Sequence, residues 1–105
     1  METAAAIGTL VKQLLPYGRL TLEEVAARER MSVRTLQRRL RNWGFSFEEI
    51  VDDVRRTEAI GHVLAGEHST MEIAFLLGYS DHAHFTRAFR RWTGLSPREY
   101  ARARV

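Results

Sequence analysis

Residues 70 to 96 read TMEIAFLLGYSDHAHFTRAFRRWTGLS, and residues 22 to 46 read LEEVAARERMSVRTLQRRLRNWGFS. Both stretches contain a Val or Ile followed by Ala, then a turn with Ser, then a helix that carries large apolar residues and arginines before a Trp. A short helix, a tight turn and a second helix make a helix-turn-helix motif. The internal repeat therefore predicts two helix-turn-helix units in one chain.

The two predicted turns differ at one position. Ala26 and Ala74 have small side chains that let the paired helices approach closely. Gly78, four residues after Ala74, suits a turn position with positive φ. The first repeat has Arg30 at that position, where a left-handed backbone would cost about 1 kcal/mol. We therefore expect the first unit to depart from the ideal turn at this residue.

Helix start signals recur along the chain. A Ser or Thr followed three residues later by Glu predicts a capping box, in which the two residues satisfy free backbone N–H groups of the first turn. Four segments match: Thr21 with Glu24, Ser46 with Glu49, Ser69 with Glu72, and Ser96 with Glu99. Together with the apolar periodicity, they predict an all-α fold of seven helices. These are expected at about residues 4–15, 22–29, 33–43, 47–64, 70–77, 82–93 and from 97 onward.

Length and composition limit the organisation. The chain has 105 residues, of which 45% are hydrophobic, enough for one modest domain. We expect one domain over 1–105, homeodomain-like in its helices, with a first helix-turn-helix subdomain at about 4–45, a linker helix at about 47–64 and a second subdomain at about 67–105. Cysteine is absent, which excludes disulfides and thiolate zinc sites. No apolar run is long enough to span a bilayer, so we expect a soluble, cytoplasmic protein without membrane contact.

The basic residues are almost all arginine. Of 16 basic residues, Lys12 is the sole lysine, and the net charge is +3. The planar guanidinium group matches phosphate and guanine edges, although a high genomic GC content also favours arginine codons. Arginines without acidic neighbours lie in 34–41 and 87–91, which are the second helices of the two repeats.

A helical wheel separates two faces of helix 82–93. One face contains the apolar residues Phe85, Ala88, Phe89 and Trp92. The other contains Ala83, His84, Thr86, Arg87, Arg90 and Arg91. An apolar face for the core and a cationic face with small polar residues are typical of a helix that lies in the major groove of DNA.

The acid and two histidines at the start of this helix raise the alternative of a metal site. His82 and His84 are two residues apart, about 200° around the helix, so they cannot chelate one ion as an i, i+4 pair can. Asp81 stands where helix capping is the ordinary role. We therefore predict no metal site and no cofactor. We interpret His84, on the outer face, as a base or phosphate contact, and His82, toward the core edge, as a packing residue.

Helix 33–43 shows the same division. Its apolar side contains Val33, Leu36, Leu40 and Trp43, and its outer side contains Arg34, Thr35, Arg38, Arg41 and Asn42, with Gln37 at the border. Arg38 can form bidentate hydrogen bonds with guanine and Gln37 with adenine, each pair worth about 1–3 kcal/mol of discrimination. A solvated arginine-rich face would explain either helix alone, but the two helices together favour DNA binding.

The segment GYSDHAHFTRAFRRWTGLSPREY, residues 78 to 100, resembles the signature of the AraC/XylS family of transcriptional regulators. The likeness lies in the Gly-Tyr-Ser turn, the Phe and Arg-Ala-Phe core, the Gly after the aromatic residue, and the Ser-Pro and Tyr of the last helix. SVRTLQRRL, residues 32 to 40, is similar to the first recognition helix of that family. The resemblance covers about residues 20 to 102.

This resemblance implies a C-terminal DNA-binding domain that places two recognition helices in successive major grooves of double-stranded DNA. Carried over by position, the base-contacting residues would be Arg34, Gln37, Arg38, Ala83, His84 and Arg87. The residues that we expect at the DNA backbone are Ser32, Thr35, Arg41, Ser80, Thr86, Arg90 and Arg91. Ala83 offers only a methyl group, so the second helix is expected to contact fewer bases.

The predicted linker helix agrees with this arrangement. About 18 residues of helix are about 27 Å long, comparable with the ~34 Å between successive major-groove faces. Gly61 lies inside this helix and costs up to about 1 kcal/mol there. Either close packing requires a glycine at this position, or the linker has some flexibility.

The sequence leaves other partners and functions open. Members of the AraC/XylS family usually carry an effector-binding or dimerisation domain, and none is evident in this sequence, so the chain is either the C-terminal piece of a larger regulator, which we favour, or a short stand-alone member. RNA polymerase is a further candidate partner. The alternative function is an arginine-rich helical protein-interaction module. We expect no enzyme, because no nucleophile, base and orienting group converge in the sequence.

Overall fold

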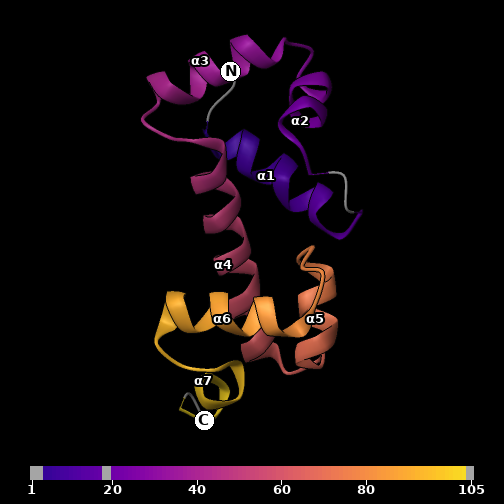
Figure 1. The fold of residues 1–105 in the computed structure, drawn as a ribbon, viewed down its shortest axis with the longest axis vertical. Coiled ribbons are helices and arrows are strands. Elements are labelled where there is room, and N and C mark those ends of the chain that lie inside the picture. Colours follow the sequence, from indigo (N-terminus) through magenta and orange to yellow (C-terminus); the bar gives the residue numbers. More distant parts are fainter. Residues whose placement is uncertain (1–3, 18–19, 104–105) are drawn as a thin grey trace. The chain divides into compact units, whose positions relative to one another are not determined.

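Seven α-helices and one 3-10 turn make up the regular structure of residues 4–17 and 20–103, which are the residues that the computed structural model describes. The helices, shown in Figure 1, are α1 (Ala4–Leu14), η1 (Leu15–Tyr17), α2 (Leu22–Arg28), α3 (Val33–Asn42), α4 (Phe47–Ala65), α5 (Thr70–Leu76), α6 (His82–Thr93) and α7 (Pro97–Ala103). The all-α prediction is confirmed. Two compact units, 1–54 and 55–105, divide within α4, and each has its own core.

Several helices end one residue away from the predicted positions. The clearest physical reason is at α1, which stops at Leu14 and tightens into η1. Pro16 lies inside η1, and because proline has no backbone N–H, the α-helical hydrogen bonding cannot continue through it. The ends of α6 agree with the prediction at both residues.

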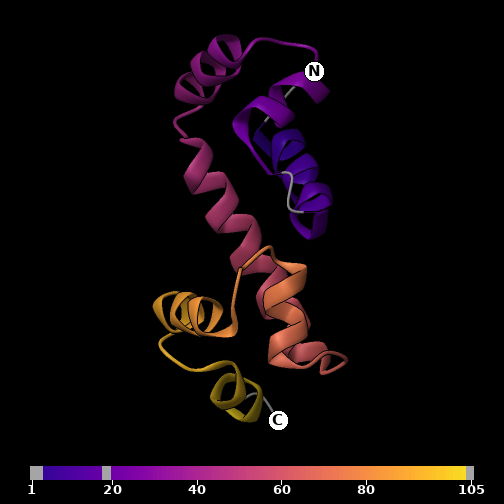
Figure 2. The same ribbon diagram turned by 45° about the vertical axis from the view of Figure 1, so that its right-hand side comes forward.

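The core of the first unit is aliphatic. It is formed by buried side chains of α1, η1, α2, α3 and the first half of α4, namely Ile7, Val11, Leu14, Leu15, Val25, Ala26, Leu36, Leu40, Ile50 and Val51. Helix α2 contacts both α1 and α3, and Figure 2 shows α1 lying alongside α2. These contacts hold the short helix α2 in place and fix the buried side of α3.

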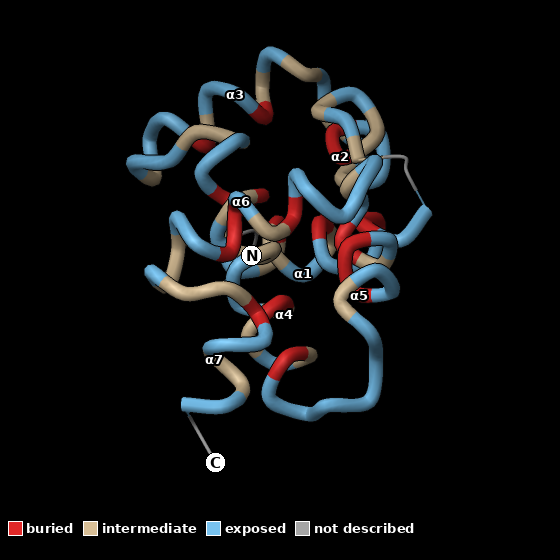
Figure 3. Tube along the Cα trace, turned by 60° about the horizontal axis from the view of Figure 1, so that its bottom comes forward, coloured by how far each residue is buried: buried red, intermediate tan, exposed pale blue. Residues whose placement is uncertain are grey.

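The core of the second unit is built around aromatic rings. Phe85 and Phe89 of α6 are fully buried, and their ring centroids are 5.8 Å apart in an edge-on arrangement. Phe89 also meets Tyr100 of α7 at 5.4 Å. The other buried residues of this unit are Ala59, Val63, Ile73, Ala74, Leu77, Ala88 and Pro97. Figure 3 shows buried stretches alternating with exposed ones along the helices, which is the periodicity expected of helices that pack on one side.

Both helix-turn-helix turns have the same backbone geometry. The φ angle is +82° at Gly78 and +57° at Arg30, the one residue other than glycine with positive φ in the described part of the chain. In each turn the next residue donates a 3.0 Å hydrogen bond to the small alanine of the preceding helix, from the N–H of Tyr79 to the carbonyl of Ala74, and from Met31 to Ala26. Arg30 thus adopts the left-handed conformation that glycine takes in the second repeat.

Three of the four predicted capping boxes are complete. Reciprocal hydrogen bonds join Ser46 with Glu49, Ser69 with Glu72, and Ser96 with Glu99. The bonds from Ser96 hold the pKa of Glu99 below its ordinary value, and those from Ser69 do the same for Glu72. At Thr21 the hydroxyl oxygen accepts from the N–H of Glu24, whose carboxylate pairs with Arg28 at 3.5 Å.

Candidate nucleic-acid interface

Helix α3 has one buried side and one exposed, basic side. Ser32 caps its N-terminus by accepting a 3.1 Å hydrogen bond from the N–H of Thr35. Leu36 and Leu40 are buried against the first-unit core, whereas Val33 and Trp43 are half-buried. The exposed residues on the opposite side are Ser32, Arg34, Gln37, Arg38 and Arg41, with Thr35 half-buried among them. The predicted division into two sides is confirmed, but Val33 and Trp43, which were predicted on the buried side, are only half-buried. Four polar side chains with long reach project from the other side.

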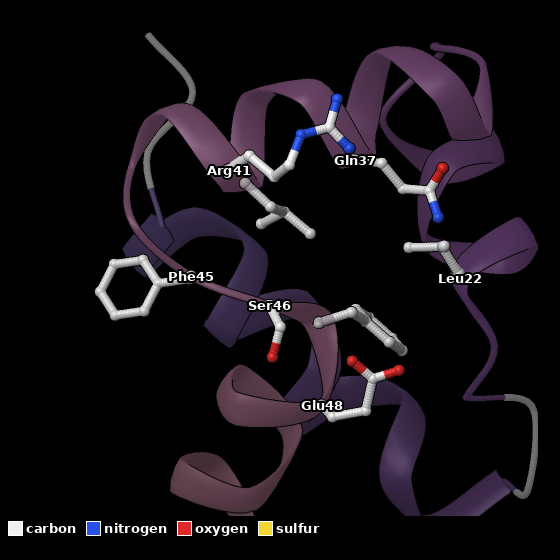
Figure 4. Close-up of a pocket in the computed structure, with 8 residues that line it drawn as sticks. Leu22, Gln37, Arg41, Phe45, Ser46 and Glu48 are labelled. Atoms are coloured by element: carbon white, nitrogen blue, oxygen red, sulfur yellow. The ribbon is translucent and has the colours of Figure 1, made fainter.

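Two of these residues also border a small pocket. Gln37 and Arg41 lie on the edge of α3 above Leu22 of α2 and Glu48 of α4, as Figure 4 shows. The pocket has a volume of about 180 Å³, and its other lining residues are Leu40, Phe45, Ser46 and Phe47. Gln37 is therefore at the border between the exposed face and the body of the unit, as the helical wheel predicted.

Helix α6 repeats this arrangement with an aromatic core side. Asp81 caps its N-terminus, since its Oδ1 atom accepts a 2.8 Å hydrogen bond from the N–H of His84. Phe85, Ala88 and Phe89 are buried. Of the residues predicted to contact DNA, Ser80, Ala83, His84, Arg87, Arg90 and Arg91 are exposed and Thr86 is half-buried. Both recognition-helix candidates therefore present their arginines away from their own cores.

The first turn of α6 holds a polar cluster. The His84 Nδ1 atom lies 3.3 Å from the Asp81 Oδ2 atom and 3.3 Å from the hydroxyl oxygen of Ser80. The hydrogen bond from the backbone N–H of His84, with help from the charges of His84 and Arg87, holds the pKa of Asp81 below its ordinary value. Asp81 is therefore a carboxylate over the whole physiological range, and it orients the imidazole ring.

Two predictions about α6 are wrong. His82 is exposed rather than packed at the core edge, because it is the first residue of the helix and precedes the apolar stripe that begins at Phe85. Trp92 is half-buried rather than part of the core. It lies one residue before the end of α6, where its ring meets Phe89 at 6.4 Å and the guanidinium of Arg91 at 5.7 Å.

Arg90 has an acidic partner that sequence reasoning missed. Its Nη1 atom lies 3.4 Å from the Glu99 Oε1 atom of α7, with both side chains about half exposed. The two residues are nine apart in the sequence, a spacing with no regular meaning in a single helix. The ion pair depends on how α7 packs against α6, so no local sequence pattern predicts it.

Arg55 is a second residue that sequence reasoning missed. Its Nε atom donates a 3.0 Å hydrogen bond to the carbonyl of Leu77, and its guanidinium lies 4.8 Å from the ring centroid of Tyr79. The Tyr79 ring is in turn 5.8 Å from that of Phe85. Arg55 therefore joins the second half of α4 to the turn that precedes α6. Arg55 and Leu77 are 22 residues apart in the sequence, and no sequence pattern predicts their contact.

Metal sites and membrane-spanning helices are two further features for which the same residues can be assessed. Among residues 4–17 and 20–103, no group of three or more His, Asp or Glu side chains is arranged to hold a metal ion. None of the helices described there is long and apolar enough to cross a membrane.

Comparison with known proteins identifies the family. A family model described as a helix-turn-helix domain matches residues 25–103, which include the second repeat and all but the first three residues of the first. The chain belongs to the AraC-type family of helix-turn-helix transcriptional regulators. This family consists of DNA-binding regulators of transcription rather than enzymes.

AraC-type regulators from several bacteria are similar in sequence. The ornithine utilization regulator of Pseudomonas aeruginosa is 39% identical over 106 residues, a match that covers 98% of this chain and 31% of the regulator. The transcriptional regulator VirS of Mycobacterium tuberculosis is 37% identical over 91 residues, covering 87% of this chain and 27% of VirS. The chain thus spans about a third of the length of these relatives.

Solved structures of AraC-type domains have the same fold. The C-terminal domain of AraT, a response regulator from Geobacillus stearothermophilus, matches with a TM-score of 0.82 and 29% identity, over 97% of this chain and 85% of that domain. The DNA-binding domain of the global transcriptional factor AdpA, solved in complex with a target DNA, matches with a TM-score of 0.77 and 26% identity, over 98% and 93%. This chain is therefore an AraC-type DNA-binding domain.

Proposed function

We propose that this AraC-type domain recognises specific double-stranded DNA by inserting α3 and α6 into successive major grooves. The observation that carries the proposal is the repeated arrangement of the two helices. Each is the second helix of a helix-turn-helix unit, each buries an apolar side, and each exposes two or more arginines on the other side. An α-helix fits the major groove, where guanidinium groups can pair with guanine edges.

The base contacts that we propose follow from the chemistry of the exposed side chains. On α3 they come from Arg34, Gln37 and Arg38, and on α6 from Ala83, His84 and Arg87. Arginine suits guanine and glutamine suits adenine, while the alanine methyl group can contact the methyl group of thymine. Helix α3 therefore offers more hydrogen-bonding groups than α6, and we expect its half-site to be the more strictly specified.

Further residues of the two helix-turn-helix units are assigned to the DNA backbone. They are Ser32, Thr35, Arg41, Ser80, Thr86, Arg90 and Arg91, of which Thr35 and Thr86 are half-buried and the others are exposed. Contacts with phosphate fix the position of a protein on the duplex without specifying sequence. Because Arg90 pairs with Glu99, its guanidinium would be shared between that carboxylate and a phosphate.

We propose α4 as the linker between a first subdomain, about 4–45, and a second, about 67–105. The helix has 19 residues and is therefore about 28 Å long. That length is comparable with the ~34 Å that separates successive major-groove faces. A single chain could then occupy two half-sites without a second copy.

The other activities of the full-length regulator are a separate proposal. Because the relatives are about three times as long as this chain, we assign DNA contact to these residues and effector binding to a segment outside them. Contact with RNA polymerase would follow once the regulator is on its site. The same role implies the compartment that contains the DNA, which is the cytoplasm in bacteria, and it requires no cofactor and no catalysis.

Substitution of one arginine on each helix tests the proposal. We expect Arg38→Ala and Arg87→Ala each to weaken specific binding by about 1–3 kcal/mol, because each removes one base contact. Both side chains are exposed, so the thermal unfolding temperature should hardly change. Affinity would be measured by fluorescence anisotropy on a duplex selected from random sequence.

Arg28→Ala provides the matched control. Arg28 is an exposed arginine on α2, paired with Glu24, and it is outside the two proposed recognition faces. Its replacement should leave specific affinity within a factor of about two, since surface pairs of this kind contribute little. Unchanged binding in both Arg38→Ala and Arg87→Ala would contradict the assignment and support the protein-interaction alternative.

A further inference from the structure

The two ring nitrogens of His84 have different surroundings: Nδ1 contacts neighbouring protein groups, whereas Nε2 lies on the opposite side of the ring. Its Nδ1 atom lies 3.3 Å from a carboxylate oxygen of Asp81 and 3.3 Å from the Ser80 hydroxyl. The side chain is 54% exposed, and it shares the outer face of α6 with Arg87. The free edge of the imidazole, which carries Nε2, is therefore the edge available to a base.

Asp81 decides which nitrogen of the neutral ring carries the proton. An ionised carboxylate can only accept hydrogen bonds, so a proton on Nδ1 of His84 places a donor toward the Asp81 Oδ2 atom 3.3 Å away, where an unprotonated Nδ1 would face it with a lone pair. The Ser80 hydroxyl can accept from the same N–H group. Because Asp81 also accepts from the backbone N–H of His84, which lowers the pKa of its carboxyl group, Asp81 is an ionised acceptor beside the imidazole ring. The Nε2 atom of neutral His84 is then a hydrogen-bond acceptor.

Charged groups from the neighbouring elements are engaged elsewhere or lie further along α6. On α5, Glu72 is bonded to Ser69, and Arg55 of α4 is bonded to the Leu77 carbonyl. Helix α7 contributes Arg98, Glu99, Tyr100 and Arg102 beside the second half of α6, where Glu99 pairs with Arg90. Arg90 is six residues after His84, about 9 Å along the helix. Among the residues that the structure describes, Asp81 and Ser80 lie against the imidazole, and Arg87 is one turn away.

We propose that His84 makes base selection by the second recognition helix depend on pH, with adenine or cytosine preferred when the ring is neutral and guanine when it is protonated. The inference rests on the proposed function and names the chemistry of one of its contacts. Neutral His84 presents an acceptor, which complements the amino group of adenine or cytosine in the major groove. Protonated His84 presents a charged donor, which complements the O6 and N7 acceptors of guanine.

The pH range of this change is accessible in a binding experiment. Histidine is the side chain that ordinarily changes charge between about pH 5 and pH 8. The arginines of both recognition helices keep their charge throughout that range. The half-site of α3, which has no histidine, should therefore not depend on pH.

The test is selection of the 105-residue chain against randomised duplex DNA at about pH 8 and about pH 5.5, on either side of that range. We expect one position of the α6 half-site to change from adenine or cytosine to guanine as pH falls, with a change in relative affinity of about threefold to tenfold, the range for one hydrogen bond. The His84→Gln variant should lose this dependence. His82→Gln, which replaces the other exposed histidine of the same turn, should keep it.

A second variant tests the role of Asp81. In Asp81→Asn the amide oxygen can still accept from the backbone of His84, so the helix cap is kept. Its amide N–H, however, can donate to Nδ1, which moves the imidazole proton to Nε2. We expect this variant to prefer guanine even at about pH 8. Circular dichroism would confirm that all three variants remain helical.

The outcomes separate this inference from the proposed function. Enrichment of two half-sites with the same bases at both pH values would overturn the inference while leaving the proposed function intact. A pH dependence that persists in His84→Gln, or that affects the α3 half-site equally, would overturn it as well. Absence of any enriched sequence at either pH would defeat the proposed function, and this inference with it.

Discussion

Arg30 shows how tertiary packing decides the conformation of a single residue. Its φ angle of +57° matches the glycine geometry of the second repeat, although an arginine is strained there. The hydrogen bond from Met31 to Ala26 has the same length as the equivalent bond from Tyr79 to Ala74. The tight approach of α2 and α3 therefore imposes the turn, and Arg30 adopts it at a cost.

Replacement of this arginine should recover part of that cost. We expect Arg30→Gly to raise the free energy of unfolding by about 0.5 kcal/mol, the relief of left-handed strain less the greater entropy loss of glycine. The reverse change in the other turn, Gly78→Ala, should lower it by about 1 kcal/mol, because φ is +82° there. Urea denaturation followed by circular dichroism would measure both. A less stable Arg30→Gly variant would mean that the arginine side chain contributes more than its backbone costs.

Within helix α4, the surroundings of Gly61 show whether close packing requires a glycine at this position. A Cβ atom built at Gly61 would have no heavy atom within 4 Å outside its own helix backbone, so close packing does not require a glycine at this position. Gly61 is the fifteenth residue of this 19-residue helix, inside its last turns rather than at its end. Gly61 therefore lowers the stability of α4 without a compensating contact within the described residues.

The corresponding prediction is that Gly61→Ala stabilises the domain by about 0.5–1 kcal/mol, the difference in helix propensity between the two residues. Gly94→Ala is the matched control. Gly94 ends α6 with a φ of +82°, where a side chain is strained, so this substitution should destabilise by about 1 kcal/mol. Thermal unfolding of the two variants beside the parent chain would measure the difference. A destabilised Gly61→Ala variant would contradict the conclusion that a side chain fits at this position without steric contact.

The faces of the helices could be predicted because helical periodicity is a local property. Leu36, Leu40, Phe85 and Phe89 recur at the spacing of one helix side, and all four are buried. Helix ends were predicted less well, as at Pro16, because a single capping residue or proline decides where a helix stops, whereas periodicity is averaged over several turns. The role of each exposed side chain toward DNA stays a prediction.

Contacts between elements could not be predicted, because they depend on how helices pack. The Arg55 contacts with Leu77 and Tyr79, and the ion pair of Arg90 with Glu99, join residues with no regular spacing. The exposure of His82 and the half-burial of Trp92 have a related cause, since a helical wheel does not show where the neighbouring helices stop covering a face. These misses all lie at or near the ends of α6 or on its neighbours, which are the places where tertiary packing decides.

At the scale of the whole molecule, the net charge of +3 is small, and the position of the arginines matters more than their number. Each unit exposes basic residues on one recognition helix, whereas acidic residues concentrate in 23–29 and 48–58. Neutralisation of phosphates releases counterions, so the affinity of a DNA-binding domain falls steeply with salt. A protein-interaction module that binds its partner through other surfaces would bind DNA weakly, and its affinity for DNA would not depend on salt in this way.

The most direct test of the account is selection of the chain against randomised duplex DNA at one pH, followed by affinity measurements on the enriched sites over a range of salt. We predict two short motifs whose centres are about one helical turn apart, with affinity that falls linearly on a log–log plot against salt. Arg38→Ala should weaken the base preference in one of the two motifs only, and Arg87→Ala should weaken it in the other. A single motif, or affinity that does not change with salt, would contradict the claim that both recognition helices bind DNA.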